Sequence, residues 1–411
     1  MVPDGWKVCQ VGEIARVIRG ASPRPKGDHR YYGGKVPRLM VSDVTRDGKY
    51  VTPKTDFLTE EGAKLSRPMP AGSLTVVCSG TVGVPSFLAV DACIHDGFLA
   101  LDNISDTCDK EYLYYTFSRL QQDFDSAATH GGVFTNLTTE ILRTFKILLP
   151  TVPEQKQIAA ILSGVDEAIA STQAVIDQTR KVKQGLLQQL LTRGIGHTKF
   201  KESAIGKIPE SWEIVPLAQL CEKIVNGYVG ATRDIYHEEG TPYILCQNVR
   251  ANRFVPKIFK WVSKEFHENN SRSALKEGDV ITVQTGAGNG DTCVVPPQFD
   301  GANCHALIIS RAKPNLLNSY YLSEYLNSPE GRARIDVIST GMAYPHLNTT
   351  ELRKLLIPLP TIQEQDGIVQ YLRSFESTIF ENEFYLNSLE NLKRGLMQDL
   401  LTGKVRVGCT P

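Results

Sequence analysis

The chain repeats itself at an offset of 210 residues, and this repeat limits the possible fold more than any other feature. The segment LPTVPEQ at 149–155 returns as LPTIQEQ at 359–365, and KQGLLQQLLT at 183–192 returns as KRGLMQDLLT at 393–402. A repeat this long indicates two copies of a domain-plus-helix unit rather than a solenoid of short modules. The domains before the two helices, here called heads, agree only in outline. A common scaffold with two different heads suits a molecule that reads two different features at a fixed distance.

The composition is that of an ordinary soluble protein. With 411 residues, 41% of them hydrophobic and 22% charged, the chain is expected to form two or three domains. No apolar run reaches the roughly 18 to 20 residues that cross a bilayer, and the first residues lack the pattern of an export signal. The nine cysteines are scattered, without a Cys-x-x-Cys pair. We therefore expect a cytoplasmic protein with reduced cysteines, no zinc, no disulfide framework and no membrane contact.

The net charge is zero, because 45 Lys and Arg residues balance 45 Asp and Glu residues. A protein that binds nucleic acid alone by neutralising phosphates is usually basic. This balance argues against an autonomous, non-specific DNA-binding protein. It leaves room for local basic loops, or for a partner that supplies most of the phosphate contacts.

Two long helices are the firmest structural prediction. Thr151 and Glu154, and again Thr361 and Glu364, form the Thr-x-x-Glu pattern of a capping box at the start of each helix. Beyond them, apolar residues recur at alternating steps of four and three, which is the period of a coiled coil. Each helix would span ~60 Å. The apolar seam positions are Ile158, Leu162, Val165, Ile169, Ile176, Leu186 and Leu190, then Ile368, Leu372, Phe375, Ile379, Leu386, Leu396 and Leu400.

Polar residues interrupt the seam of both helices. Asn382 is expected opposite Thr172, and Lys183 opposite or near Lys393. Such groups either fix the register of a coiled coil or mark solvated ends of its seam. Gly185 and Gly395 weaken the helices at matching places, which suggests close approach or a kink, and Gly194 and Gly403 are expected as left-handed C-caps.

The two heads show the same order of predicted elements. In the first, strands at 73–78 and 87–90 flank a turn at 79–83, a helix covers 110–123, and a strand at 147–150 closes the head. The second head repeats this order with strands at 279–284 and 292–295, a helix at 320–334 and a strand at 354–358.

We therefore expect an α+β chain with two globular mixed α/β domains separated by an antiparallel two-helix coiled coil, a pseudo-two-fold tandem repeat. The expected segments are a first head at 1–150, a long helix at 151–194, a linker at 195–208, a second head at 209–360, a second long helix at 361–403 and a tail at 404–411.

The sequence offers little for catalysis. The glycine-rich stretch 286–290 follows a strand, as a dinucleotide-binding loop does, but 291–295 continues as strand and provides no helix N-terminus for a phosphate. We interpret it as a hairpin loop. His95, His305 and His346 are isolated, so we expect no catalytic residue and no metal site in this chain.

Several loops of the heads carry residues suited to reading bases. Arginine can contact guanine with two hydrogen bonds, and asparagine or glutamine can do the same with adenine. In the first head the candidates are Arg19, Ser22, Arg24, Lys26, His29, Arg30, Tyr31, Ser79, Thr81, Thr135 and Asn136. In the second they are Asn226, Tyr228, Arg233, Gln247, Asn248, Arg250, Thr285, Asn289, Tyr344, His346 and Asn348.

Taken together, these features resemble the specificity subunit of type I restriction–modification enzymes over almost the whole chain. The features that carry the resemblance are the doubled Leu-Pro-x-x-x-Glu-Gln motif before a long helix, the Leu-Leu-Thr-Gly-like helix ends with Arg193 in place of the first glycine, Trp6 and Trp212, and the Arg19-Gly20-x-Ser22-Pro23 stretch. The base-reading residues above do not follow from the family, because its heads differ widely.

The resemblance implies that each head is a target-recognition domain for one half of a gapped, two-part site in double-stranded DNA. The helices would set the gap and dock two adenine methyltransferase subunits, and restriction–translocation subunits would join for cleavage. S-adenosylmethionine, ATP and magnesium would be bound by those partners, and the target adenine would be flipped by the methyltransferase. A ~60 Å helix pair suits half-sites one to two DNA turns apart, at ~34 Å per turn.

Three other readings stay open. The chain could be a self-contained enzyme that uses the 286–290 loop, although nothing else in the sequence supports this. It could serve a fused subunit that both methylates and cuts DNA, or act as a coiled-coil adaptor without base preference.

Overall fold

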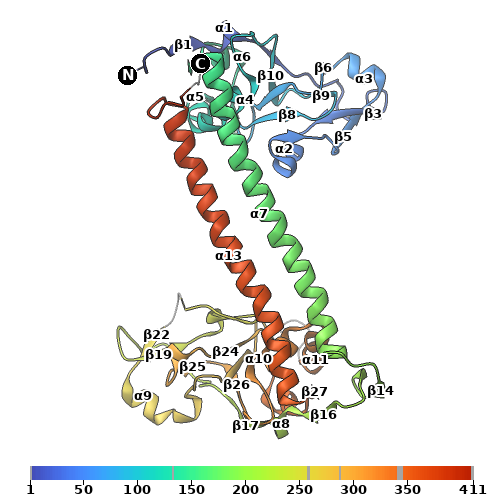
Figure 1. The fold of residues 1–411 in the computed structure, drawn as a ribbon, viewed down its shortest axis with the longest axis vertical. Coiled ribbons are helices and arrows are strands. Elements are labelled where there is room, and N and C mark those ends of the chain that lie inside the picture. The colour runs from blue at the N-terminus through green and yellow to red at the C-terminus, as the bar shows by residue number, and fades with distance from the viewer. Residues whose placement is uncertain (1, 132–133, 257–259, 287, 340–345, 409–411) are drawn as a thin grey trace. The chain divides into compact units, whose positions relative to one another are not determined.

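The structure is a computed structural model that describes residues 2–131, 134–256, 260–286, 288–339 and 346–408 (Figure 1). The chain divides into two compact units, residues 1–173 with 384–411 and residues 174–383. Each unit contains one head together with parts of both long helices. Among the described residues, no helix is both long enough and apolar enough to cross a membrane.

The head of unit 1 is built from two mixed sheets and a pair of strands that joins its two ends. Its first strand, β1 (Lys7–Gln10), pairs antiparallel with its last, β13 (Lys146–Leu149), so the head begins and ends at the same place. The larger sheet has the order β2 (Arg16–Arg19), β10 (Phe98–Asp102), β7 (Leu74–Val77), β8 (Pro85–Leu88) and β4 (Tyr50–Val51). The smaller sheet has the order β5 (Asp56–Leu58), β3 (Tyr32–Leu39), β9 (Ala92–Ile94) and β6 (Arg67–Met69).

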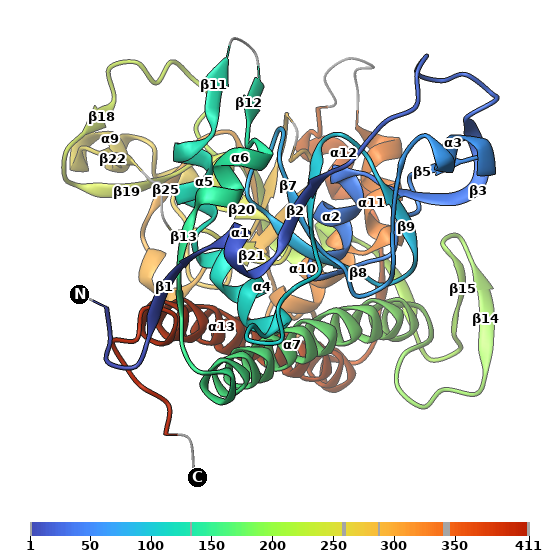
Figure 2. The ribbon, with the colours of Figure 1, turned by 90° about the horizontal axis from the view of Figure 1, so that it is seen from above.

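Short helices cover these sheets. The main core lies between the larger sheet and the helices that follow it, where Leu74, Val76, Leu99, Leu113 and Phe117 are buried together. The predicted helix at 110–123 is two helices, because Leu120 leaves the helical conformation between them. The helices are α1 (Val11–Ile14), α2 (Val41–Asp47), α3 (Glu60–Lys64), α4 (Lys110–Arg119), α5 (Gln121–Ala127) and α6 (Thr139–Thr144). Figure 2 shows the hairpin of β11 (Thr129–Gly131) and β12 (Phe134–Asn136) beside α5 and α6.

The head of unit 2 has the same order of central strands as the head of unit 1, with additional strand pairs around them. Its first sheet has the order β17 (Cys221–Asn226), β26 (Leu307–Ala312), β23 (Val280–Val283) and β24 (Thr292–Val294). Its second sheet has the order β18 (Tyr236–His237), β22 (Lys260–Val262), β19 (Thr241–Ile244) and β25 (Asn303–Cys304). The pairs β14 (Phe200–Ser203) with β15 (Gly206–Pro209), β16 (Glu213–Pro216) with β27 (Leu356–Leu359), and β20 (Val249–Arg250) with β21 (Arg253–Phe254) complete it.

The helices of this head are also short. Pro329 starts a new helix, so the region predicted as one helix at 320–334 contains two. The helices are α8 (Leu217–Leu220), α9 (Lys264–Asn269), α10 (Ser319–Asn327), α11 (Pro329–Ile338) and α12 (Thr349–Lys354), with single 3₁₀ turns η1 (Cys246–Asn248), η2 (Ser271–Ser273) and η3 (Pro297–Phe299).

The two heads therefore share a framework that the sequences reveal only in outline. In unit 1 the order β2-β10-β7-β8 matches β17-β26-β23-β24 in unit 2. The parallel pairing of β3 with β9 likewise matches that of β19 with β25. The glycine-rich stretch near 286–290 connects β23 to β24, which run antiparallel, so its interpretation as a hairpin loop is confirmed.

The long helices are α7 (Val152–Arg193) and α13 (Ile362–Leu400), and within each unit they run antiparallel. In unit 1, Ile158 and Leu162 share a buried cluster with Leu400. In unit 2, Leu190 shares one with Ile368 and Leu372. Every apolar residue expected in the seam is buried or half-buried.

The lysines of the seam differ from the expectation. Lys183 does not lie opposite Lys393: it pairs with Glu376 at 2.6 Å, and Lys393 pairs with Asp166 at 2.6 Å. These two ion pairs are repeats of each other at the 210-residue offset. Thr172 and Asn382 each donate to a carbonyl one turn earlier in their own helix, those of Ala168 and Thr378.

The glycines of the helices divide into two kinds. Gly194 and Gly403 have φ of 65° and 70°, so the predicted left-handed helix ends are confirmed. The expected close approach at Gly185 and Gly395 is wrong, because an added Cβ at either position would meet no atom within 4 Å.

The repeated Glu-Gln pair joins each head to its helix. The Trp6 indole donates to the Glu154 carboxylate at 3.1 Å, and Trp212 donates to Glu364 at 3.1 Å. The carboxylates thus do not turn back to complete the predicted capping boxes. Of the two boxes, only the bond from the Glu364 amide to the Thr361 hydroxyl (3.3 Å) is present among the described contacts. A buried indole N–H needs an acceptor, and the glutamate supplies it.

The glutamine of the motif holds the loop that precedes α4 in unit 1 and α10 in unit 2. The Gln155 amide accepts from the Asp109 backbone N–H at 2.7 Å and donates to the carbonyls of Thr107 (3.0 Å) and Pro150 (2.8 Å). In unit 2, Gln365 makes the same three bonds, to Asn318, Leu316 and Pro360. Both side chains are fully buried. The motif therefore encodes a structural joint, repeated in both units.

Candidate nucleic-acid interface

Polar residues gather at one end of the larger sheet of head 1. We call Arg19, Ser22, Ser79, Asp96 and Asn136 the first sheet-end cluster. Arg19 donates through Nε to the Asp96 carbonyl at 2.9 Å and through Nη2 to the Asn136 side chain at 3.2 Å. Ser22 donates to the Asp96 carboxylate at 2.6 Å, and Ser79 forms a backbone bridge with Asn136. The end of β2, the turn after β9, the end of β7 and the end of β12 thus meet at one place.

A buried arginine fixes the loop that leaves this cluster. The Arg38 side chain is only 6% exposed, and it pairs with Asp56 at 2.6 Å and donates to the Ser22 hydroxyl at 2.5 Å. Its guanidinium lies over the Tyr32 ring, 5.4 Å from the centroid, and the Tyr32 hydroxyl donates to the Pro23 carbonyl at 2.8 Å. Such a connected network holds side chains in one arrangement before any ligand arrives.

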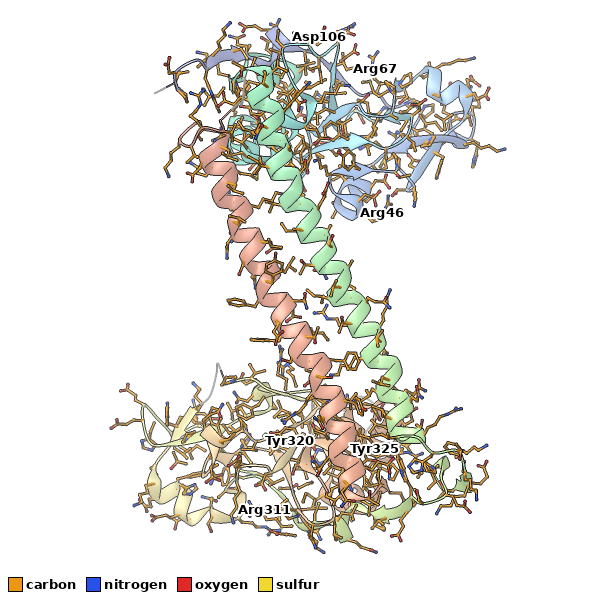
Figure 3. All side chains as sticks on the ribbon, viewed as in Figure 1. Arg46, Arg67, Asp106, Arg311, Tyr320 and Tyr325 are labelled. Atoms are coloured by element: carbon orange, nitrogen blue, oxygen red, sulfur yellow. The ribbon has the colours of Figure 1, made fainter. Side chains whose placement is uncertain are left out.

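The charges of the cluster are set by these contacts. Burial raises the pKa of Asp96, but the bond from Ser22 and the neighbouring His95 outweigh it, so the pKa falls below its ordinary value. Burial lowers the pKa of His95, whose Nδ1 accepts from the Gly97 backbone N–H at 2.8 Å. Near neutral pH the cluster therefore presents the anionic Asp96 carboxylate and the cationic Arg19, beside the neutral imidazole of His95. Arg67, labelled in Figure 3, adds another cation next to it and donates to the Arg19 carbonyl at 3.4 Å.

Head 2 has a corresponding cluster in the same part of its framework. We call Asn226, Tyr228, Gln284, Thr285 and His346 the second sheet-end cluster. Gln284 donates to the Asn226 side chain at 2.6 Å, and Thr285 forms a backbone bridge with His346. Gly227 donates to the Leu307 carbonyl as Gly20 donates to that of Phe98, so Asn226 stands where head 1 has Arg19.

Aromatic rings take the place of the buried arginine in head 2. Tyr243, the counterpart of Arg38 in the strand register, is fully buried, and its hydroxyl lies 3.4 Å from His305 Nδ1. The Tyr228 ring packs edge-on against Phe266 at 5.0 Å and lies 6.4 Å from the His305 ring. The two clusters thus share backbone geometry and differ in side-chain chemistry.

Several residues predicted to read bases lie apart from the clusters. Arg24, Lys26, His29 and Arg30 are exposed on the loop after Ser22. Arg24 approaches Asp96 to 3.5 Å, and Arg30 pairs with Asp28 and lies over the half-buried Tyr31 ring. Also exposed are Thr81, Arg233, Gln247 and Arg250, of which Arg250 donates to the Val249 carbonyl and lines a groove beside α13. The side chain of Thr135 and all of Tyr344 lie outside the described residues.

Three asparagines predicted to read bases serve the protein's own backbone or core instead. Asn248 is fully buried, accepts from the Leu245 N–H at 2.9 Å and donates to the Val255 carbonyl at 2.8 Å. Asn348 caps α12 by accepting from the Glu351 N–H at 2.9 Å. Asn289 is buried and donates to the Ser339 hydroxyl at 3.1 Å. Asparagine satisfies local backbone groups as readily as it reads a base, and these contacts show that the protein itself uses these three side chains. Their contact with DNA stays a prediction.

Asp96, Gln284 and the buried Arg38 are not among the residues predicted from the amino-acid sequence to read bases. The prediction rests on basic and amide side chains in loops. It therefore leaves out the acidic Asp96, Gln284 at the end of a predicted strand, and Arg38 inside β3. One signal was available: His95 and His305 both end a short strand at matching places in the two heads. Within the described ranges, no group of three or more His, Cys, Asp or Glu side chains could hold a metal ion.

The comparisons with known proteins agree with this architecture. The family model described as type I restriction modification DNA specificity domain matches residues 3–179 and again 209–391. The chain is 26% identical over 412 residues to the type I restriction enzyme MjaVIII specificity subunit of Methanocaldococcus jannaschii, covering 99% of this chain and 94% of that protein. It is 21% identical to the EcoKI specificity subunit of Escherichia coli, covering 98% and 89%.

Solved structures show the same fold. The S subunit of a type I restriction-modification system from M. genitalium superposes with a TM-score of 0.58 at 14% identity, covering 98% of this chain and 97% of that one. A chain from a study of complex assembly and conformational transition of the type I R-M system superposes with a TM-score of 0.62 at 18% identity, covering 98% and 100%. With two matches of the family model that together span most of its length, this chain belongs to the type I restriction-modification DNA specificity family.

Proposed function

We propose that this chain is the DNA sequence-specificity subunit of a type I restriction-modification complex, in which each head reads one half of a two-part, gapped site. The family and the curated relatives, which are specificity subunits of such enzymes, support this role. The chain contributes sequence reading, and the chemistry on DNA belongs to the subunits with which it assembles.

The observation that carries the proposal is that one framework holds different side chains in the two heads. Arg19 in head 1 corresponds to Asn226 in head 2, and Asn136 corresponds to His346. Arginine offers two donors to guanine, whereas asparagine offers a donor and an acceptor to adenine. Two heads with one backbone plan and different base-edge chemistry suit an asymmetric two-part site.

The partners follow from the family. Specificity subunits of type I systems assemble with methyltransferase and restriction subunits on DNA, and we extend this to two methyltransferase subunits that dock on the long helices. In this proposal S-adenosylmethionine is bound by the methyltransferase, and ATP and magnesium by the restriction subunits. A zero net charge is compatible with such an assembly, because the partners can supply most phosphate contacts.

The test is a methylation map. DNA from cells that express this chain with its neighbouring methyltransferase would be compared with DNA from cells that express the methyltransferase alone. We expect methylated adenines in one gapped, two-part motif that appears only when this chain is present. If a methyltransferase of verified activity gives no new motif with this chain, the proposal fails.

Two variants distinguish a specificity subunit from an adaptor without base preference. Arg19→Ala is expected to relax one half-site, and Asn226→Ala the other, since the residues lie in different heads. An adaptor would give the same methylation pattern in both variants as in the unchanged chain. A fused methyltransferase–nuclease partner would be recognised by a nuclease domain in the reading frame next to the gene for this chain.

A further inference from the structure

We propose that Asp96 is a specificity-determining residue of head 1, and that its carboxylate reads a cytosine by accepting a hydrogen bond from the 4-amino group in the major groove. The inference rests on the proposed function and deepens it, because it names the base that one side chain recognises. The Asp96 carboxylate lies at the sheet end beside the cations Arg19 and Arg24.

The two oxygens of this carboxylate have different surroundings. Oδ1 accepts from the Ser22 hydroxyl at 2.6 Å, and His95 Nδ1 lies 3.4 Å from it. Oδ2 has one described contact, with the Arg24 guanidinium at 3.5 Å, and the Arg24 side chain is 73% exposed. The Asp96 side chain is itself 49% exposed. One oxygen is thus fixed by the protein, while the other remains accessible for a donor from a ligand.

The position is also rigid. Ser22, which holds Oδ1, receives a hydrogen bond from the buried Arg38, and the Asp96 backbone carbonyl accepts from Arg19 at 2.9 Å. A carboxylate held in this way loses little conformational entropy when it meets a base.

Charge limits what Asp96 can contact. A carboxylate repels phosphates, and it can only accept hydrogen bonds. On the major-groove edges of the bases, the donors are the cytosine 4-amino and the adenine 6-amino groups. Adenine carries its N7 acceptor beside the amino group, and N7 would face a lone pair of the carboxylate. Cytosine presents only its amino group, and the guanine paired with it offers acceptors to a neighbouring cation such as Arg24.

Head 2 indicates that the framework does not need the carboxylate. The turn after β25 passes through His305 and Ala306, where head 1 has His95, Asp96 and Gly97. Both turns begin at a histidine and lead into equivalent strands, β10 and β26. Because the turn forms in head 2 without an acidic residue, we attribute Asp96 to the half-site of head 1 rather than to folding.

The experiment is a methylation map of Asp96→Asn in the full chain with its methyltransferase. Asparagine keeps the size of the side chain and an oxygen for Ser22, but its amide can place a donor against the base. We expect the preference for cytosine at one position of one half-site to fall by about 10- to 100-fold, while the other half-site and the gap stay unchanged. The intact second half-site then reports that the variant folds and assembles.

A second measurement uses the unchanged protein. Target DNA would carry 2-pyrimidinone, which lacks the 4-amino group, in place of the cytosine at the mapped position. We expect the unchanged complex to bind this DNA about 10-fold more weakly than normal DNA, and the Asp96→Asn complex to bind both equally. Equal binding of the two DNAs by the unchanged complex, at every cytosine of the head 1 half-site, overturns the inference even if the variant does not fold.

A control variant separates base reading from a general loss of negative charge in this head. Asp106→Asn changes an exposed carboxylate of the same head, labelled in Figure 3, outside the cluster, and should leave the motif unchanged. The DNA with 2-pyrimidinone separates base reading from support of the loop, because it removes the amino group of the base and leaves the protein unchanged. A motif that Asp96→Asn leaves unaltered refutes the inference alone, whereas the absence of any motif with the unchanged chain refutes the proposed function.

Discussion

At the scale of single residues, buried polar side chains determine how each head meets its helix. Glu154 and Glu364 accept from tryptophans, and Gln155 and Gln365 each satisfy three backbone groups. A buried amide that fills three hydrogen bonds is costly to remove, because its partners are then left without water or protein contacts.

Gln155→Ala tests this joint. The substitution leaves one N–H and two carbonyls of a buried loop unpaired, so we expect it to lower the free energy of unfolding by about 2 to 3 kcal/mol. Urea unfolding followed by circular dichroism measures the change. Gln157→Ala, two residues further on and exposed, is the matched control and should change the free energy by less than about 0.5 kcal/mol. Equal effects of the two substitutions would contradict the assigned role.

Glu324 makes stability depend on pH in an unusual direction. This α10 residue is buried, and burial raises its pKa from 4.5 to about 7, although Asn252 donates to its carboxylate at 2.8 Å. Lys183 and Arg373 act to lower the pKa, and Glu376 acts to raise it. Between pH 4.5 and about 7 the folded state binds more protons than the unfolded state, so stability falls as pH rises through this window, by about 3 kcal/mol in total.

Glu324→Gln should remove this dependence. The variant has no proton to lose, so we expect its unfolding free energy at pH 8 to exceed that of the unchanged chain by about 3 kcal/mol, and the difference to shrink steadily toward pH 4.5. Urea unfolding at pH 5, 6, 7 and 8 would show it, with the exposed Glu390→Gln as control. A variant that keeps the slope of the unchanged chain would rule out Glu324 as its source.

The residue scale is also where prediction from sequence is weakest. The sequence predicts base reading by Arg19 and Asn136 from two separate loops, and the structure brings the two side chains within hydrogen-bond distance. Asn248 and Asn348 have the same chemistry in the sequence but cap their own backbone. Which partner an amide takes depends on the loop conformation around it, and no pattern of residue types encodes that choice.

At the scale of elements, periodicity predicted the long helices well and the head helices less well. A 3.5-residue apolar repeat over some forty residues indicates a coiled-coil helix and no other element. The helices α7 and α13 begin within one residue of the expected positions. The stretches 110–123 and 320–334 each contain two helices, because a change of axis at Leu120 or Pro329 hardly alters the apolar pattern. The expected linker at 195–208 contains the hairpin of β14 and β15, whose polar strands carry no alternating signal.

The repeated ion pairs of the helices should contribute to stability in proportion to their burial. The side chains of Lys183 and Glu376 are 20% and 41% exposed. We expect a coupling of about 0.5 to 1 kcal/mol in a double-mutant cycle built from Lys183→Met and Glu376→Gln. The more exposed pair of Lys264 and Glu268, at 3.8 Å, should give less than about 0.3 kcal/mol. A cycle at Lys183 and Glu376 with no coupling would show that this ion pair does not stabilise the helix pair.

At the scale of the whole molecule, the tandem repeat supplies two versions of one binding framework in a single chain. In each unit the same joint connects the head to the start of one long helix, α7 in unit 1 and α13 in unit 2. This design allows the two heads to differ in Arg19 and Asn226, or in Asp96 and Ala306, without changing how either head is held. The half-sites and the gap between them should therefore respond to different substitutions.

A change in helix length tests that separation. Residues 171–177 of α7 and 382–388 of α13 lie between the two repeated ion pairs in both helices. Deleting both segments removes one heptad from each helix and keeps the seam pattern. At 1.5 Å per residue the helices shorten by ~10 Å, about three base pairs of DNA at ~3.4 Å each.

We expect the methylation map of this deletion variant to show both half-sites unchanged and a gap about three base pairs shorter. Replacing the same segments with heptads of equal length should leave the gap as it was. If the deletion variant methylates sites with the original gap, the long helices do not set the spacing, and the heads must locate their half-sites in another way.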